Sequence, residues 1–194
     1  MRPAHLSPSQ FHRMMSSGRR KDEKFGKTAE SYAEEVVQRM IGYIPDQIMT
    51  PAMQWGIDNE PLAVEAYERE KFAEVTGRKT RLVHPLLDYV SGEPDGLVGE
   101  DGIIEIKCPN ASNHFKNIRS GSQIEDYKWQ IQGYMWLTDR KWCDFVSFHP
   151  LQPEEFRLSI NRVVRDEEMI NDIAGRCSEF WDELVIPIYE EVTK

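Results

Sequence analysis

The feature that most constrains this chain is a pair of short motifs carried by two neighbouring segments. Pro94-Asp95-Gly96 opens the first segment and Glu105-Ile106-Lys107 closes the second, with nine residues between Asp95 and Glu105. Both segments are rich in Val, Ile and Leu, which is typical of strands, and Asp101-Gly102 between them favours a hairpin turn. Antiparallel pairing of the two strands then returns Asp95 to the neighbourhood of Glu105 and Lys107.

The register of this hairpin decides whether the three charged side chains share a face. Because side chains alternate along a strand, Glu105 and Lys107 lie on one face, and Asp95 joins them only if it lies opposite one of the two. A three-residue loop over 100–102, with Gly102 in the left-handed region, pairs Asp95 with Lys107. A two-residue turn pairs it with Cys108, on the wrong face. We therefore expect the three-residue loop or a compensating bulge.

Two carboxylates and a lysine on one sheet face suit the hydrolysis of a phosphodiester. Carboxylate oxygens are ligands that Mg²⁺ and Mn²⁺ prefer. Such a metal lowers the pKa of a bound water and neutralises charge on a phosphodiester oxygen. Lys107 beside it can hold or deprotonate the attacking water. The alternative is a surface hairpin with a solvated Glu105–Lys107 pair, and Pro94-Asp95 at this distance favours the site over that alternative.

The rest of the chain predicts one domain, 1–194, of the α/β class, an α+β mixed sheet flanked by helices. It divides into a helical part with a basic loop (1–50), a catalytic core (51–160), and a C-terminal helix and tail (161–194). Capping boxes at Ser7/Gln10 and Ser122/Glu125, and Thr50-Pro51, predict three helix starts. Further helices are predicted after Thr28 and over 166–184, and strands over 81–84, 87–90, 95–98, 103–107, 144–148 and 155–160.

Composition narrows the classes of partner and compartment. A net charge of −9, from 24 basic and 33 acidic side chains, argues against a general basic surface that coats nucleic acid, but not against a local basic groove. Cys108, Cys143 and Cys177 include no CxxC pair, which disfavours disulfides and zinc knuckles and favours a reducing cytoplasm. No apolar run approaches the roughly 20 residues of a membrane span. We therefore expect a cytoplasmic protein with no membrane partner.

The paired motifs resemble the PD-(D/E)XK signature of nucleases. The longer strings 94–97 and 104–109, together with Trp55-Gly56 followed by Glu60 and the segment 127–136, resemble the bacteriophage lambda exonuclease and YqaJ-type viral recombinase group. The resemblance implies a restriction-endonuclease-like core and a Mg²⁺ cofactor, which Mn²⁺ can replace. It assigns metal ligation to Asp95, Glu105, the carbonyl of Ile106 and Glu60. It makes Lys107 the water-activating residue and Gln130 the residue that positions water or the scissile phosphate.

Contacts to DNA are expected at less specific positions. The resemblance places Arg2 and Ser9 at a terminal 5′-phosphate, and a serine at a helix start suits an anion, although simple capping is the alternative. Arg19 and Arg20 lead a basic cluster that runs to Lys27, read either as phosphate contacts or as a solvated face. Met53 is read either as an apolar wedge at a duplex end or as core packing. After the 104–109 string relatives carry a basic residue, whereas this chain offers Asn113 and His114, with Lys116 and Arg119 further on. Glu93 is a second departure, because relatives carry a serine there and an acid would repel a phosphate.

The resemblance implies a metal-dependent 5′-to-3′ exonuclease that degrades one strand of linear double-stranded DNA. The remaining 3′ single-stranded tail would pass to a single-strand-annealing protein, and the enzyme would be a homotrimer ring, phage- or prophage-encoded, in a bacterial host cell. The alternatives are an endonuclease of restriction or repair type and a catalytically idle DNA-binding or assembly module. The net acidity further predicts an acidic outer surface, with positive charge confined to the path of DNA.

Overall fold

The computed structural model describes residues 6–18, 23–43 and 48–194, and a five-stranded sheet lies at its centre. In sheet order the strands are β1 (Val75–Thr76), β4 (Gly96–Val98), β5 (Gly102–Lys107), β6 (Trp142–Phe148) and β7 (Leu158–Val164). β5 and β6 run parallel, whereas the other neighbours run antiparallel. Two short strands, β2 (Leu82–Val83) and β3 (Ser91–Gly92), pair separately. The predicted α/β class with a mixed sheet is confirmed.

Strands β4 and β5 form the hairpin of the two motifs. Val98 lies opposite Gly102, so the loop spans three residues, 99–101, and Gly99 adopts the left-handed conformation with φ of 54°. The expected loop length is correct, but its position is wrong by one residue, and Asp95 comes opposite Glu105 rather than Lys107. Gly102 is needed inside the strand, because a Cβ there would lie 2.1 Å from the Trp142 ring. Gly99 therefore supplies the left-handed residue of the loop in place of Gly102.

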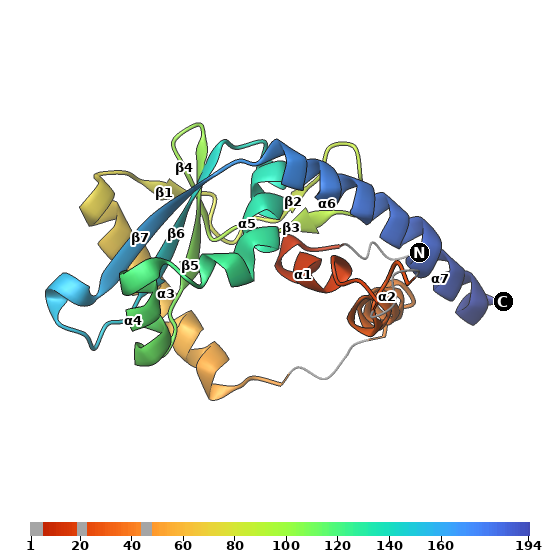
Figure 1. Cartoon of the computed structure of the whole chain (residues 1–194), viewed down its shortest axis with the longest axis horizontal. Helices are drawn as coiled ribbons and strands as arrows, with labels where there is room; N and C mark the ends of the chain where they lie inside the picture. The colour runs from red at the N-terminus through yellow and green to blue at the C-terminus, as the bar shows by residue number, and fades with distance from the viewer. Residues whose placement is uncertain (1–5, 19–22, 44–47) are drawn as a thin grey trace.

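Two helices cover opposite faces of the sheet, α3 (Pro51–Lys71) on one side and α5 (Ile124–Thr138) on the other (Figure 1). Ile104 and Ile106 of β5 pack with the apolar side chains of α3, whereas Ile103 packs with those of α5. The alternation of β5 therefore divides its side chains between two cores, and Glu105 and Lys107 project to the α5 side. Pro61 lies inside α3 and has no N–H to donate to the preceding turn.

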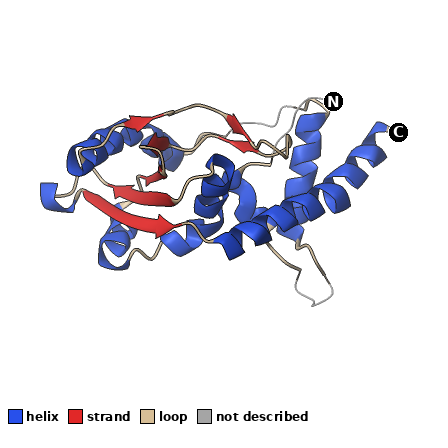
Figure 2. Cartoon of the chain, turned by 90° about the horizontal axis from the view of Figure 1, so that it is seen from above, coloured by secondary structure: helices blue, strands red, loops and turns tan. Residues whose placement is uncertain are grey.

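The helices from the two ends of the chain form a group beyond one end of the sheet (Figures 1 and 2). This group contains a 3₁₀ turn at Pro8–Gln10, then α1 (Phe11–Met14), α2 (Lys27–Met40), α6 (Glu167–Phe180), a π-helical turn at Trp181–Val185 and α7 (Ile186–Thr193). Its core joins buried residues from both ends of the chain, among them Phe11, Tyr32 and Phe180. None of the helices within the described ranges is both long and apolar enough to cross a membrane.

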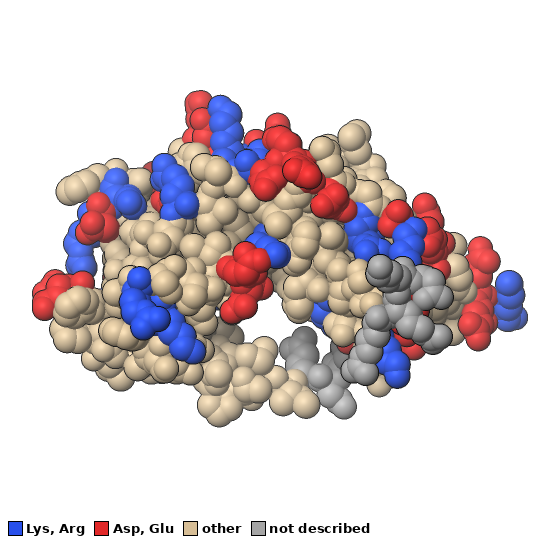
Figure 3. Space-filling model, in the orientation of Figure 1, with Lys and Arg blue, Asp and Glu red and all other residues tan. Residues whose placement is uncertain are grey.

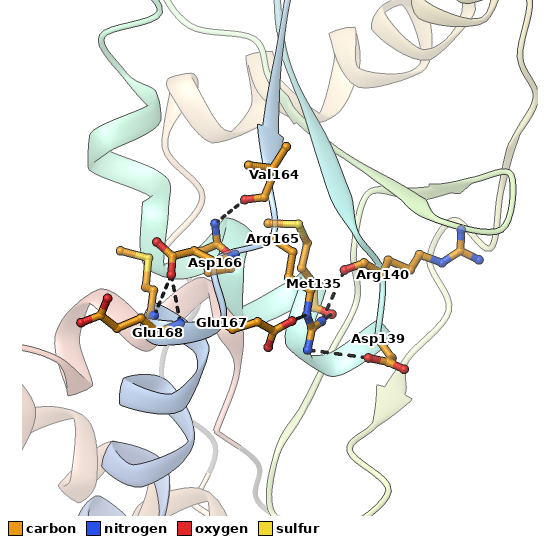
Figure 4. Close-up of polar contacts among 10 residues, drawn as sticks. Met135, Asp139, Arg140, Val164, Arg165, Asp166, Glu167 and Glu168 are labelled. Atoms are coloured by element: carbon orange, nitrogen blue, oxygen red, sulfur yellow. Dashed lines mark hydrogen bonds and ion pairs between the residues drawn. The ribbon is translucent and has the colours of Figure 1, made fainter.

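Hydrogen bonds at the junction of β7 and α6 tie this helical group to α5 (Figure 4). The Arg165 guanidinium donates to the carbonyl of Met135 at 2.7 Å and to the Glu167 carboxylate at 2.6 Å. Gln132 of α5 donates to the carbonyl of Val164 at 2.9 Å and accepts from the amide of Asp166 at 3.0 Å. The helix that carries Gln130 is therefore fixed to both the sheet and the helical group.

The predicted helix starts are correct in part. The Thr50 hydroxyl accepts from the amide of Met53, as predicted. Neither predicted capping box forms: the Ser7 hydroxyl bonds the Ser9 hydroxyl at 3.0 Å, and α5 begins after Gln123 with no side-chain cap. The helix predicted over 166–184 continues through the π-helical turn into α7.

Two other elements differ from the sequence prediction. Helix α4 (Ala111–Ser120), capped by Asn110, was not predicted, because its buried positions are the polar residues His114 and Asn117 and leave no apolar period. The strand predicted over 155–160 begins at Leu158, since the preceding residues form a 3₁₀ turn after Pro153. Of the segment predicted as a strand over 87–90, Val90 makes an isolated bridge to Leu6.

Candidate active site

Asp95 and Glu105 converge at the point where β4 meets β5. The Asp95 carboxylate accepts a hydrogen bond of 2.6 Å from the amide of Ile106. Burial raises the pKa of Asp95 well above its usual value and the charge of Glu105 raises it further, whereas Lys107 lowers it. Two acids in this arrangement repel each other in the absence of a cation. The cation in place here is the ammonium group of Lys107.

Glu105 is the most confined of the acidic groups at the site, with 1% of its surface exposed. Its Oε1 accepts from the Lys107 ammonium at 2.6 Å and from the Gln130 amide at 2.6 Å. Its Oε2 is buried and has no hydrogen-bond partner. A buried carboxylate oxygen without a donor is costly, so this atom is the clearest sign that the site is built to receive a positively charged or hydrogen-bonding ligand.

Lys107 is held between a carboxylate and an aromatic ring. Its ammonium nitrogen lies 4.5 Å from the centre of the Tyr127 ring, which is within range of a cation–π contact. Burial acts to lower the pKa of Lys107, but the charges of Glu105 and Asp95 outweigh it, so the pKa lies above its usual value. The sequence placed Lys107 and Glu105 on one face, and the structure brings them together.

Glu60 reaches the same site from α3, but with a partner that the sequence did not indicate. Its carboxylate accepts from the Arg78 guanidinium at 2.9 Å, and the two side chains are 31% and 28% exposed. The Arg78 Nε is buried without a partner. Arg78 precedes Lys79 in the loop after β1, and Lys79 has a positive φ of 55°. No short sequence spacing links Arg78 to Glu60, so only the fold reveals the pair.

The donor set fits a magnesium-type ion. Asp95 and Glu105 supply oxygen ligands, and the unpartnered Glu105 Oε2 provides a vacant acceptor. Within residues 6–18, 23–43 and 48–194, no three His, Cys, Asp or Glu side chains are gathered into a finished metal cage. Glu60 is the third candidate, and its carboxylate is bound to Arg78. Burial raises the pKa of the adjacent Cys108 thiol to about 12, so it remains protonated and is a poor ligand.

These residues line a cleft of about 610 Å³ with two unlike walls. We call Asp95, Glu105, Lys107 and Gln130 the sheet wall, and the facing residues of α3 the α3 wall: Ala52, Met53, Gly56, Ile57 and Glu60. The face shown in Figure 3 is hollowed between the start of α3 and the helices α1 and α5. Tyr127, Tyr134 and Gln123 also line the cleft and were not among the predicted site residues. Tyr127 and Tyr134 lie on α5, three residues before and four residues after Gln130, so the helical period could have indicated them.

Two of the predicted DNA contacts lie in this cleft. Ser9 lines it, and its hydroxyl bonds that of Ser7 rather than capping the short helix. Met53 also lines the cleft and is 52% exposed, so the alternative of core packing is wrong for this side chain. Whether either residue touches DNA stays a prediction.

The other predicted DNA contacts lie elsewhere. Lys116 is on α4, outside the cleft lining, and bonds the Asn113 side chain at 3.4 Å. Lys and Arg side chains gather over α4 in Figure 3, whereas acidic and basic side chains mix along the upper edge. His114 is buried against Ser147 and the carbonyl of Phe156, so it is not a free surface donor. Arg2, Arg19 and Arg20 lie outside the described residues.

Comparison with known proteins places this geometry in a family. Residues 1–141 match the model of the YqaJ-like viral recombinase domain. LHK-Exo, an alkaline exonuclease from Laribacter hongkongensis, is 32% identical, with a TM-score of 0.86 over 99% of this chain and 93% of that chain. The structure of LHK-Exo in complex with dAMP gives 31% identity and a TM-score of 0.85, covering 99% and 95%.

A phage-related exonuclease from Haemophilus somnus shares the fold at 19% identity, with a TM-score of 0.79 over 95% of this chain and 96% of that chain. The search of curated proteins found no match. The solved relatives therefore have exonuclease folds of the PD-(D/E)XK type, as the paired motifs predicted.

Proposed function

The chain belongs to the YqaJ-like viral recombinase family, and we propose that it is a magnesium-dependent exonuclease acting on linear double-stranded DNA. Membership of this family supports a nuclease role and a DNA substrate. The observation that carries the catalytic part of the proposal is the buried, unpartnered Oε2 of Glu105 beside Asp95 and Lys107. A scaffold without catalysis has no need to keep such an oxygen unsatisfied.

The residues of the sheet wall divide the work of phosphodiester hydrolysis. Asp95, Glu105 and the carbonyl of Ile106 would hold the ion, with Glu60 contributing from α3. Mg²⁺, when bound, supplies the Lewis acidity that eases deprotonation of water and offsets charge on the phosphate. Lys107 would orient the attacking water and stabilise charge that develops on the phosphate oxygens. Gln130, which approaches Glu105 from α5 at 2.6 Å, would fix that water or the scissile phosphate from the other side.

Polarity and assembly form the finer part of the proposal. We propose that the enzyme degrades one strand from its 5′ end and leaves a 3′ single-stranded tail for a single-strand-annealing protein. The presence of Ser9 in the catalytic cleft supports a contact to the 5′ end. Encirclement of DNA by a homotrimer would keep the enzyme on its substrate. Both ideas rest on the family resemblance.

A time course on linear duplex DNA, labelled at either 5′ end or either 3′ end, tests activity, metal dependence and polarity together. We expect Mg²⁺-dependent release of the 5′ label as a mononucleotide and no loss from closed circular duplex. Cleavage of the circle would favour the endonuclease alternative, and a lack of Mg²⁺-stimulated hydrolysis would favour the idle module. Lys107→Ala should abolish cleavage, while the variant remains folded at the assay temperature and its duplex binding stays close to that of the wild type. Wild-type hydrolysis by that variant would remove the proposed mechanism.

A further inference from the structure

Three described glycines lie within α-helices, and their surroundings differ. A Cβ on Gly133 of α5 would lie 2.6 Å from the Phe11 ring, so close packing explains that glycine. A Cβ on Gly175 of α6, or on Gly56 of α3, would meet nothing within 4 Å. Gly175 lies on the exposed surface of α6, but Gly56 lines the cleft. Packing within the chain therefore does not account for Gly56.

Glycine in a helix interior is unfavourable relative to alanine. The backbone of Gly56 does not require a glycine, because its φ is not positive. It lies four residues before Glu60 and three after Met53, so the three residues share one face of α3. This is the face that forms the α3 wall. The open space above Gly56 is therefore part of the cleft, directly before the acidic end of that wall.

The chemistry of the two walls indicates what fills this space. Amide groups in a helix interior are already hydrogen-bonded, so the backbone at Gly56 offers no donors to a phosphate. Its neighbours Ala52, Met53 and Ile57 are apolar. The groups suited to a phosphate and its metal ion lie on the sheet wall: the Lys107 ammonium, and the Glu105 Oε2, which has no hydrogen-bond partner. A nucleotide in the cleft would therefore face the sheet wall with its phosphate and α3 with its sugar.

We propose that Gly56 is a positioning residue whose missing side chain lets the deoxyribose of the cleaved strand lie against α3. This proposal rests on the proposed nuclease function, since it concerns the substrate of the same cleft. It predicts that one substitution changes the stability of the protein and its affinity for DNA in opposite directions. A side chain at position 56 strengthens the helix and weakens the substrate complex.

The test compares Gly56→Ala and Gly56→Leu with Gly175→Ala and Gly175→Leu as matched controls. Thermal unfolding should show a rise in Tm of about 2–4 °C for both alanine variants, because each improves helix propensity without a clash. Duplex affinity, measured by fluorescence anisotropy on a labelled linear duplex with Ca²⁺ in place of Mg²⁺, should fall about tenfold or more for Gly56→Ala. It should fall further for Gly56→Leu and stay at the wild-type value for both Gly175 variants.

A third measurement separates steric exclusion from an effect through the metal ligands. Mn²⁺ affinity, followed by electron paramagnetic resonance without DNA, should be the same for Gly56→Ala and the wild type. An equal loss of Mn²⁺ and duplex affinity would overturn the proposal, because the substitution would then act through Glu60. A lowered Tm for Gly56→Ala would also overturn it, since the space would not be open. So would duplex affinity of Gly56→Leu equal to that of Gly175→Leu.

Failure of the proposed function gives a different pattern. If the wild type binds duplex but does not hydrolyse it with Mg²⁺, the nuclease assignment fails, and the affinity comparison still decides the role of Gly56. If the wild type binds no duplex, both proposals are wrong.

Discussion

On the sheet wall of the cleft, Glu105 is 1% exposed and accepts hydrogen bonds from the half-buried side chains of Lys107 and Gln130. On the α3 wall, Met53 is 52% exposed and Ile57 is 54% exposed. The sheet wall holds two carboxylates and an ammonium group, whereas the α3 wall is apolar and solvent-facing except for Glu60. The contrast indicates that most of the chemistry belongs to the sheet wall and accommodation of the substrate to the apolar part of the α3 wall. Each prediction below tests one side of that division.

The largest effect is expected from Glu105→Gln on the sheet wall. The substitution keeps the shape of the side chain but removes a charge that no neighbour can replace, so we expect Mg²⁺-dependent cleavage to fall at least ~100-fold. Mn²⁺ titration should show a parallel loss of affinity. Glu125→Gln, at an acid of α5 whose side chain is 75% exposed, is the matched control and should retain activity. Near-normal cleavage by Glu105→Gln would show that the sheet wall does not carry out the hydrolysis.

Gly133→Ala tests how firmly the sheet wall is supported from behind. The added Cβ would lie 2.6 Å from the Phe11 ring and 3.1 Å from the Pro8 ring. Overpacking of this kind should lower the free energy of unfolding by about 1–3 kcal/mol, measured by urea denaturation. Gly175→Ala is the comparison, because it adds the same atom to open space. An unchanged urea midpoint for Gly133→Ala would mean that α5 can move away, and that the wall is less rigid than its contacts indicate.

Arg78→Ala tests the α3 wall, because Arg78 donates to Glu60, the acidic residue of that wall. Without the guanidinium, Glu60 loses the group that orients its carboxylate, and we expect the cleavage rate to fall about tenfold. Steady-state cleavage of linear duplex measures this effect. Lys141→Ala removes a more exposed ion pair, with Asp101 at the hairpin loop, and should leave the rate unchanged. An equal loss in both variants would point to a general effect of charge.

The smallest effect is expected for the stability of Met53→Ala. Because the side chain is half exposed, the free energy of unfolding should change by less than ~0.5 kcal/mol. Val64→Ala, in the same helix beyond Pro61 and 5% exposed, should cost more than ~1 kcal/mol. Urea denaturation of the two variants compares the free and the anchored half of α3. Similar losses would show that the N-terminal half is packed as tightly as the rest.

The sequence was most informative where chemistry and periodicity coincide. Alternation along β5 placed Glu105 and Lys107 on one face, and both structural and family comparisons agree with the nuclease class. The hairpin loop was misplaced by one residue because Gly99 and Gly102 are both suited to a left-handed turn position. Only the contact of Gly102 with Trp142, a strand away, decides between them.

Arg78 and α4 lay beyond sequence-based inference for a related reason. The pairing of β1 with β4 brings the loop that carries Arg78 beside Glu60. No local sequence pattern indicates this pairing. Helix α4 buries His114 and Asn117 by means of hydrogen bonds to side chains and a carbonyl. A helix held by polar contacts leaves no hydrophobic period in its sequence.

The parallel pairing of β5 with β6 bears on when this protein becomes active during its synthesis. β5 ends at Lys107, yet its parallel neighbour begins at Trp142, after a crossover that contains both α4 and α5. Pairs so distant along the chain form late in folding, because a long loop must first close. A growing polypeptide on the ribosome therefore carries Asp95 and Glu105 well before Gln130 and β6 can complete their surroundings. The long crossover between β5 and β6 therefore delays assembly of the candidate active site until most of the chain has been synthesised.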